Sequence, residues 1–271
     1  MAGLLAAALA ALPISAGAEA QARTWPPAPY PPNASVRSAR AFAEAAPGTA
    51  AFAVDGAAGG VRGLDQDLQF SSASVSKALL IAAELRRLRD QREPLDGGTR
   101  SLLESMIDFS DNDAASTIYS RVGDAGMAEV AERAGMGSFE ATPGFWGGAQ
   151  VTAGDLATFF YGLDRNLVGP HAAYAKRLFA EITSTQRWGI PAATPSSWRV
   201  YFKGGWRPPA TEETSGPVTH QAALLVHRSG VRFGMAILTD QSPGSSSYAT
   251  LEGITSRLLS DPPAPGRWPA N

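Results

Sequence analysis

The sequence predicts an α+β fold in which an antiparallel sheet is flanked by helices and an all-helical lobe is inserted into it. Strand-like segments lie near both ends of the folded region, at residues 49–64 and 198–239, and a block of helical segments separates them. The 271-residue chain is 44% apolar with a net charge of −2, which favours a packed domain over a disordered chain. We expect the chemistry in the cleft between sheet and lobe.

One domain is expected at residues 34–260. Its α/β part is predicted at residues 34–72 and 191–260, and its helical lobe at residues 73–190.

Both termini are expected to lie outside this domain. Residues 1–22 have the layout of a signal peptide, because a short apolar run precedes small residues that fit a cleavage site, although a basic leading segment is missing. A proline-rich spacer at residues 23–33 and a proline-rich tail at residues 261–271 complete the chain. The sequence therefore predicts an exported bacterial protein, secreted or held in the cell envelope.

The first elements follow from apolar spacing. A helix is predicted at residues 34–46, and a hairpin of two short strands at residues 49–54 and 61–64. Residues 75–91 are apolar on nearly all sides in their first half, which is typical of a buried helix.

Helices and strands then continue in the predicted order. Further helices are expected at residues 100–107, 113–121, 126–134, 152–165 and 172–181, strands at residues 198–206, 220–227 and 231–239, and a last helix at residues 246–259. Ser229-Gly230 predicts a tight hairpin between the last two strands.

Composition excludes several kinds of site. Cysteine is absent, which rules out disulfides, thiolate nucleophiles and zinc–thiolate centres. The three histidines (His171, His220 and His227) are too scattered for a histidine-rich metal centre. The near-neutral charge gives no field for nucleic acid, and no later apolar run is long enough to span a bilayer. We expect a monomer without metal or cofactor.

Lysine is rare, since nearly all basic residues are arginine and only Lys77, Lys176 and Lys203 are lysine. A buried amine can lose its proton, whereas a guanidinium cannot, so the few lysines are candidates for chemistry. Codon bias without chemical meaning is the alternative interpretation.

The first motif is Ser74-Val75-Ser76-Lys77. Residues three apart on a helix share a face, so the Lys77 amine can reach the Ser74 hydroxyl. A serine hydroxyl needs an adjacent base to become a nucleophile, and burial can lower the pKa of a lysine far enough to provide one. A chance match is the alternative.

The second motif is Ser110-Asp111-Asn112, between two predicted helices. It is either an ordinary helix cap, as serine and aspartate before a helix usually are, or a loop in which Ser110 relays a proton and Asn112 binds a substrate carbonyl.

The third motif is Lys203-Gly204-Gly205, inside a predicted strand that Pro208-Pro209 ends. Glycines within a strand indicate close approach of a ligand or another backbone, and the prolines favour an edge strand. The alternative is an exposed lysine beside a bulge.

Taken in this order, the three motifs resemble those of class A β-lactamases and of the wider serine penicillin-recognising superfamily. The resemblance runs over residues 34–259 and includes the surroundings of the second motif at residues 106–115 and a helix beginning at residues 151–157. It implies a β-lactamase/transpeptidase-like fold and a β-lactam or peptidoglycan-like substrate.

The resemblance also implies catalytic roles. Ser74 would be the acylated nucleophile and Lys77 its general base, and Ser110, aided by Lys203, would pass a proton to the leaving nitrogen. Asn112 would hold the substrate amide.

The third motif would form the substrate-binding strand. Gly204, Gly205 and Trp206 would lie along the substrate, and the backbone N–H groups of Ser74 and Trp206 would form the oxyanion hole.

Three departures from the family bear on the reaction. Gly204 stands where the family has serine or threonine, so a hydroxyl for a substrate carboxylate is missing, and Arg207 either replaces it or is a solvated strand-end residue. The segment at residues 137–150 shows no clear match to the glutamate that activates the deacylating water, and Glu140 is its only acid. The interval between Ser74 and Ser110 is short for class A, which predicts a more open cleft.

The resemblance and its departures predict a secreted serine hydrolase that cleaves a β-lactam or related amide or ester through a Ser74 acyl-enzyme and deacylates slowly. Antibiotic resistance is the role such activity implies. A D,D-peptidase or esterase of the same fold is one alternative, and a β-lactam- or peptidoglycan-binding module with little turnover is another.

Overall fold

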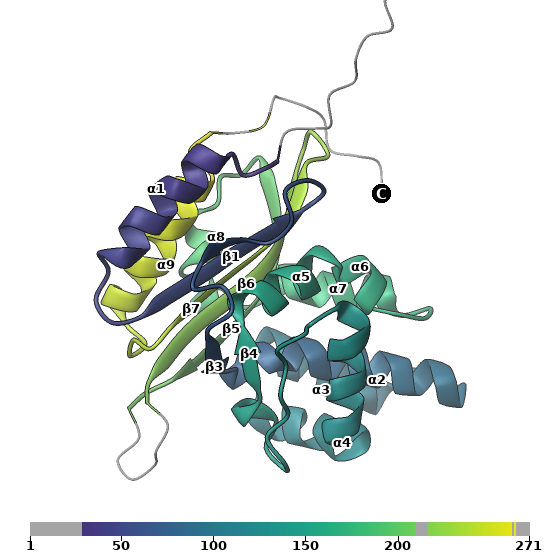
Figure 1. The fold of residues 1–271 in the computed structure, drawn as a ribbon. Helices are drawn as coiled ribbons and strands as arrows, with labels where there is room; N and C mark the ends of the chain where they lie inside the picture. Colours follow the sequence, from purple (N-terminus) through teal and green to yellow (C-terminus); the bar gives the residue numbers. More distant parts are fainter. Residues whose placement is uncertain (1–28, 210–215, 262, 264–271) are drawn as a thin grey trace, which may run out of the picture.

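A five-stranded antiparallel sheet in the order β2-β1-β7-β6-β5 forms the centre of the computed structural model, which describes residues 29–209, 216–261 and 263 (Figure 1). Its strands are β1 (Ala50–Gly56), β2 (Arg62–Leu64), β5 (Trp198–Arg207), β6 (Val218–His227) and β7 (Arg232–Thr239). Segments from both ends of the chain thus build one sheet, as predicted. The predicted signal peptide and most of the spacer and tail lie outside the described residues.

The order of the strands explains why β1 is buried. From Ala50 to Val54 the residues of β1 are all buried, because β1 lies between β2 and β7 and is covered on both faces. The predicted hairpin at Ser229-Gly230 joins β6 to β7, and it is closed by the bond from the His227 N–H to the Val231 carbonyl (2.8 Å).

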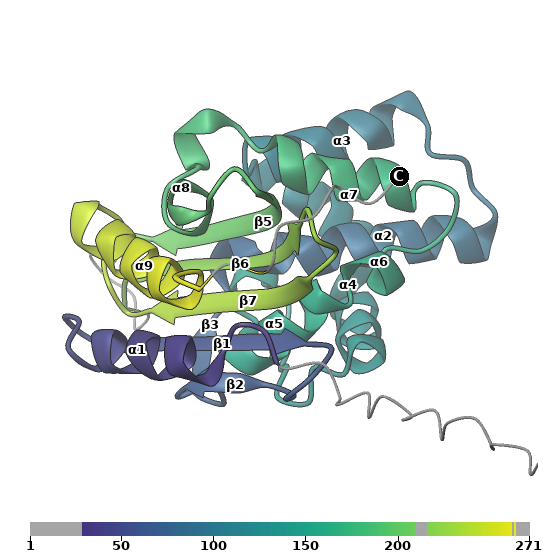
Figure 2. The same cartoon turned by 90° about the horizontal axis from the view of Figure 1, so that it is seen from above.

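Helices cover the two faces of the sheet. Helices α1 (Asn33–Glu44) and α9 (Ser245–Leu258) pack together on one face, and α5 (Ala153–Tyr161) lies against β7, β1 and β6 on the other (Figure 2). Val36, Ala39 and Ala43 form the buried stripe of α1. Val36 and Ala39 lie on the buried side as the spacing predicted, whereas the helix ends at Glu44, two residues before its predicted end at residue 46, and leaves Ala45 exposed.

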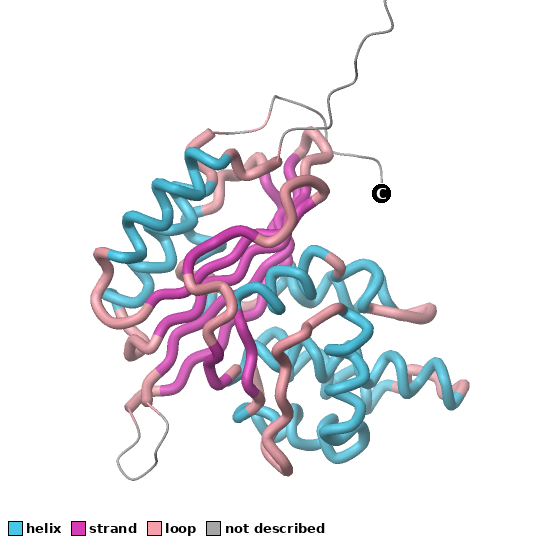
Figure 3. The backbone as a smooth tube through the Cα atoms, in the orientation of Figure 1, coloured by secondary structure: helices cyan, strands magenta, loops and turns pink. Residues whose placement is uncertain are grey.

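The helical lobe lies beside the sheet (Figure 3). Its central helix α2 (Lys77–Gln91) packs against α4 (Asn112–Ala134), and α3 (Gly97–Asp108) packs against α4 and α2. The remaining helices are α6 (Leu163–Asn166), α7 (Ala172–Glu181) and α8 (Ile190–Ala193). As predicted, the first half of α2 is buried all round. No helix in the described part of the chain is long and apolar enough to cross a membrane.

The helices expected at residues 113–121 and 126–134 both form, and Gly123 (φ 61°, ψ −173°), in a conformation that glycine adopts easily, separates them within α4. Two details differ from the expected elements. The single helix expected at residues 152–165 is divided into α5 and α6. A second sheet of β3 (Gln69–Ser71) and β4 (Gln150–Thr152) was not expected, because three-residue strands carry too little alternation to be recognised.

Strand β5 ends the sheet, so the predicted edge strand is confirmed. Its second half lies against the 3₁₀ helix η1 (Ala73–Ser76), which leads directly into α2. The edge of the sheet and the start of the lobe's central helix therefore meet where the first and third motifs lie.

Candidate active site

Ser74 lies in η1, one turn before α2 begins at Lys77. Ala73 has a left-handed backbone (φ 45°), which is uncommon for a residue with a side chain and marks a strained turn. The Ser76 hydroxyl donates to the Ala73 carbonyl (2.8 Å) and holds that turn. Ser74 remains half-buried while Lys77 is fully buried, so Ser74 keeps part of its surface exposed and Lys77 does not.

The Lys77 amine lies among four oxygen atoms. Its Nζ is 3.0 Å from Ser74 Oγ, 2.5 Å from the Ser110 carbonyl, 3.2 Å from Ser110 Oγ and 2.8 Å from Asn112 Oδ1. Burial lowers the pKa of Lys77 to about 7, against the opposing charge of Asp111. A neutral amine has two N–H groups, which the Ser110 carbonyl and Asn112 Oδ1 can accept. Its lone pair then remains for the proton of Ser74.

The loop of Ser110-Asp111-Asn112 begins a helix and also brings two residues to the Lys77 amine. Asp111 is the N-cap of α4, and its carboxylate accepts the N–H of Ala114 (2.7 Å). Ser110 has a left-handed backbone (φ 60°), and both its carbonyl and its hydroxyl contact Lys77. The cap therefore fixes the loop in which the two flanking residues reach the amine.

Lys203 approaches the same loop from the sheet. It is fully buried on β5, and its amine donates to Ser110 Oγ (3.0 Å) and to the carbonyl of Gly204 (2.9 Å). Burial and the neighbouring charge of Lys77 hold the pKa of Lys203 well below its usual value. The alternative of an exposed lysine beside a bulge is wrong, and Ser110 Oγ connects the two amines.

Gly205 allows the strand to approach the nucleophile. A Cβ at this position would lie 2.8 Å from the backbone nitrogen of Ser74 and 2.7 Å from that of Val75, closer than such contacts allow. At Gly204 a Cβ would meet only Trp188 and Gln221, at ordinary contact distances of 3.6 and 3.7 Å. The close approach inferred for this pair of glycines therefore applies to Gly205.

A buried histidine supports the nucleophile turn. His220 on β6 lies opposite Gly205, and its Nδ1 accepts the N–H of Thr239 (3.1 Å). Its Nε2 must therefore carry the proton that bonds to the carbonyl of Ser71 (3.1 Å). Burial lowers the pKa of His220 to about 4, so it stays neutral in ordinary buffers.

Trp146 is another residue at this site that the sequence did not indicate. Its ring lies over the Lys77 amine, 4.7 Å from ring centroid to Nζ, and its Nε1 donates to Ser116 Oγ (3.3 Å). Trp146 is buried within the segment at residues 137–150, where no motif marks it. Glu140 in that segment is exposed and pairs by its backbone with Gln150. In the described part of the chain, no carboxylate bonds to Ser74 or Lys77.

Two other basic residues named from the sequence are held elsewhere. The guanidinium of Arg207 donates to the Gly216 carbonyl (2.9 and 3.1 Å) and to Ser71 Oγ (3.0 Å). Lys176 pairs with Asp164 (2.5 Å). Of the three lysines, Lys77 and Lys203 alone contact the motif residues.

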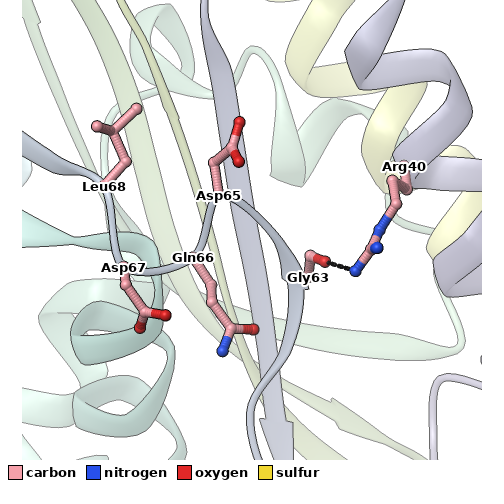
Figure 4. A pocket seen from close by; sticks show the side chains of 6 residues that line it. All are labelled: Arg40, Gly63, Asp65, Gln66, Asp67 and Leu68. Carbon is pink, nitrogen blue, oxygen red and sulfur yellow. Dashed lines mark hydrogen bonds between the residues drawn. The ribbon is translucent and has the colours of Figure 1, made fainter.

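A large hollow on the surface is formed by residues outside this cluster. It has a volume of about 770 Å³ and is lined by residues of α1 and of the segment around β2, which are drawn in Figure 4: Arg40, Gly63, Asp65, Gln66, Asp67 and Leu68. It contains none of the predicted site residues. The described residues also include no group of three or more histidine, aspartate or glutamate side chains that could hold a metal ion.

Comparisons with known proteins identify the fold. A sequence profile described as the beta-lactamase enzyme family matches residues 88–261, a range that includes Ser110 and Lys203 and begins after Ser74. The class A β-lactamase of Mycobacterium abscessus superposes with a TM-score of 0.70 at 17% identity, over 83% of this chain and 98% of that one. No curated protein matches.

Two further solved structures agree. A β-lactamase of Sphaerobacter thermophilus gives a TM-score of 0.69 at 19% identity, over 83% of this chain and 96% of its own. An ancestral class A β-lactamase gives 0.68 at 20% identity, over 83% and 99%. The α+β fold with the β-lactamase architecture is therefore confirmed.

Proposed function

The chain belongs to the beta-lactamase enzyme family, and we propose that it is a serine hydrolase that cleaves a β-lactam or a related amide or ester through an acyl-enzyme on Ser74. The observation that carries the proposal is the position of one buried amine. Lys77 Nζ lies 3.0 Å from Ser74 Oγ, and burial lowers its pKa to about 7. A half-buried hydroxyl beside a neutral amine is the arrangement that activates a serine.

Acylation follows from these contacts. Lys77 takes the proton of Ser74 as Oγ attacks the substrate carbonyl, and the carbonyl oxygen becomes an oxyanion. The Ser74 N–H, which lies close to β5 at Gly205, and the Trp206 N–H are proposed to donate to that oxyanion. Each such donor lowers the barrier by about 3 kcal/mol.

Ser110 is proposed to protonate the leaving group. Its Oγ lies 3.2 Å from Lys77 Nζ and 3.0 Å from Lys203 Nζ, so the proton taken from Ser74 can pass from Lys77 to Ser110 and on to the leaving nitrogen or oxygen. Asn112 is exposed at the start of α4 and is proposed to bind the substrate amide through its side chain.

Slow deacylation is proposed because no carboxylate among the described residues bonds to Ser74 or Lys77, where a base for water would be needed. Trp146 covers the amine of Lys77, and Glu140 is exposed and pairs by its backbone with Gln150. Loss of a positioned base slows a step by about 10²- to 10⁴-fold. We therefore expect the acyl-enzyme to accumulate.

Export is proposed from the signal-like segment at residues 1–22. The mass of the protein recovered from the medium or cell envelope of an expressing bacterium tests it: cleavage near residue 22 is expected, and a full-length protein retained in the cytoplasm would contradict it.

The proposed reaction is tested by intact-mass spectrometry after incubation with benzylpenicillin, for wild type and Ser74→Ala. We expect an increase equal to the penicillin mass on wild type alone, and a decay of that adduct over minutes to hours. Absence of adduct and of turnover with every β-lactam and activated ester tried would overturn the proposal. An equal adduct on Ser74→Ala would also overturn it.

A further inference from the structure

Aromatic rings line β5 on the side of Gly204. Trp188 stacks on Tyr248 with 4.4 Å between ring centroids and 14° between planes, and it meets Trp206 edge to face at 5.9 Å. We call these three residues the aromatic wall. Each is half-buried, so each keeps part of its surface accessible.

The aromatic wall lies next to the proposed nucleophile. Side chains alternate along a strand, so Gly204 and Trp206 face one side of β5, while Lys203 and Gly205 face the side of Ser74. The Trp188 ring lies within van der Waals reach of β5 here, since a Cβ at Gly204 would be 3.6 Å from it, an ordinary contact distance. A substrate must lie along the edge of β5 to reach Ser74. Any group of that substrate that points to the Gly204 side of the strand then contacts the aromatic wall.

The polar side chain behind the aromatic wall is turned toward the backbone of residues 188 and 190. Gln221 lies opposite Gly204 in the sheet, and one N–H of its Nε2 donates to the Trp188 carbonyl (2.8 Å). Its Oε1 accepts the N–H of Ile190 (2.7 Å). The Oε1 atom cannot bind a carboxylate because it is itself an acceptor, and one of the two donors of Nε2 is already engaged.

One carboxylate and two guanidinium groups lie near the aromatic wall. Glu252 on α9 accepts the N–H of Gly189, next to Trp188, at 3.3 Å and places a negative charge there. The guanidinium of Arg187 donates to the Ala180 carbonyl (3.1 Å) and lies over Phe202. Arg207 donates to Gly216 and Ser71 as described above. A carboxylate beside Trp188 would lose hydration next to the charge of Glu252 and would have to compete with these bonds for a guanidinium.

Two exposed aromatic side chains neighbour site residues in the sequence. Phe109, directly before Ser110, is 67% exposed, and Phe145, directly before Trp146, is 53% exposed. Among the described residues, Leu68 is the one other large apolar side chain that is similarly exposed (44%). Exposed aromatic side chains of this kind are candidates for contact with an apolar ligand.

We propose that the natural acyl donor is an uncharged ester or amide with an apolar, aromatic group on the Gly204 side, and that the site discriminates against substrates with a carboxylate there. This inference rests on the proposed function. A bond forms between Ser74 Oγ and the carbonyl carbon of the substrate. The single bond from that carbon to the leaving oxygen or nitrogen breaks, and an alcohol or amine leaves with the proton that Ser74 gave up.

Two probes that differ only in this charge test the proposal: benzylpenicillin and its methyl ester. The second-order rate constant for acylation of Ser74 is measured for each by intact mass, and is divided by the rate at which hydroxide opens the same probe, so that intrinsic reactivity cancels. We expect the methyl ester to be favoured by about tenfold or more, because its carboxyl group carries no charge that must be desolvated.

Variants connect the preference to the apolar surface. Trp188→Ala is expected to reduce acylation by the methyl ester about tenfold, whereas Trp188→Phe retains a ring and most of the rate. Because Trp188→Ala also removes packing against Tyr248, Phe109→Ser serves as a second variant on an exposed side chain. Its matched control is Leu68→Ser, which removes an exposed apolar side chain in the hollow of Figure 4, outside the site.

The outcomes separate the two proposals. Equal or faster acylation by the free acid would overturn the uncharged-substrate inference while leaving the Ser74 acyl-enzyme intact, and so would equal losses in Phe109→Ser and Leu68→Ser. If neither probe acylates Ser74, the proposed function is wrong, and the inference about an uncharged substrate is then wrong as well.

Discussion

The indole of Trp146 covers the amine of Lys77, with 4.7 Å between Nζ and the ring centroid. Trp146 belongs to the segment before β4 and Lys77 to the start of α2, and both are buried. The ring removes water from one side of the amine, which contributes to the desolvation that lowers the pKa of Lys77. In the proposed mechanism, this one contact bears both on the activation of Ser74 and on the access of water to the acyl-enzyme.

The rate of acylation is expected to rise with pH through about 7. Below the pKa of Lys77 the amine is protonated and cannot accept the Ser74 proton, so the rate constant falls about tenfold per pH unit there. The second-order rate constant measured between pH 5 and 9 checks this. Asp111→Asn retains a capping oxygen for Ala114 but removes the charge that raises the pKa of Lys77, so its midpoint is expected at lower pH. A pH-independent wild-type rate would contradict the role of Lys77.

Opening the cover over Lys77 is expected to change both steps. Trp146→Ala admits water, which raises the pKa of Lys77 and moves the acylation midpoint up by about one unit. It is also expected to shorten the lifetime of the acyl-enzyme, measured as the decay of the adduct mass. Trp146→Phe is the control that keeps an aromatic ring. Unchanged midpoint and lifetime in Trp146→Ala would show that the indole neither desolvates the amine nor excludes water.

The two glycines of the third motif are expected to differ in their tolerance of alanine. Gly205→Ala places a methyl group 2.8 Å from the Ser74 nitrogen and pushes β5 away from η1, so acylation falls about 10²-fold. Gly204→Ala meets Trp188 and Gln221 at ordinary distances and is expected to retain acylation within a few-fold. The measurement is the acylation rate of each variant, after circular dichroism has shown that the variant is folded. Equal losses of rate in the two variants would mean that the close approach of β5 to η1 at Gly205 is unimportant.

A buried ion pair is expected to stabilise the lobe without affecting the site. Glu84 on α2 is fully buried and pairs with Arg87 (2.7 Å) and with Arg121 on α4 (3.1 Å). Glu84→Ala is expected to lower the free energy of unfolding by about 3 kcal/mol in urea denaturation. The control Glu129→Ala removes an exposed pair with Arg133 and is expected to cost under about 0.5 kcal/mol. Loss of acylation in folded Glu84→Ala would contradict the separation of lobe stability from chemistry.

Local patterns were sufficient for much of the fold. The spacing of apolar residues predicted α1 and α7, and Ser229-Gly230 predicted the hairpin of β6 and β7, because these elements depend on neighbouring residues. The 3₁₀ turn at Ser74 was predicted only as the beginning of a helix. The turn contains a left-handed residue, Ala73, and alanine is a residue type that rarely adopts this backbone conformation. The division into an α/β part and a lobe stays a prediction.

The site was predictable only where motifs mark it. Ser74, Lys77, Ser110, Asn112 and Lys203 were named from the sequence, and their side chains lie together in the structure, although their catalytic roles remain proposals. Trp146, Trp188 and His220 lie in segments without a motif. Their relation to the site arises from tertiary contacts between distant parts of the chain, and a single sequence does not reveal such contacts.

Mapping the acyl group to one residue tests the central claim most directly. After a short incubation with benzylpenicillin and an acid quench, cleavage at Arg62 and Lys77 releases residues 63–77, a peptide in which fragmentation distinguishes Ser74 from Ser71, Ser72 and Ser76. We predict the penicilloyl mass on Ser74 in the wild type and on no residue of Ser74→Ala. A stable adduct on any other residue, with Ser74 unmodified, would contradict the account.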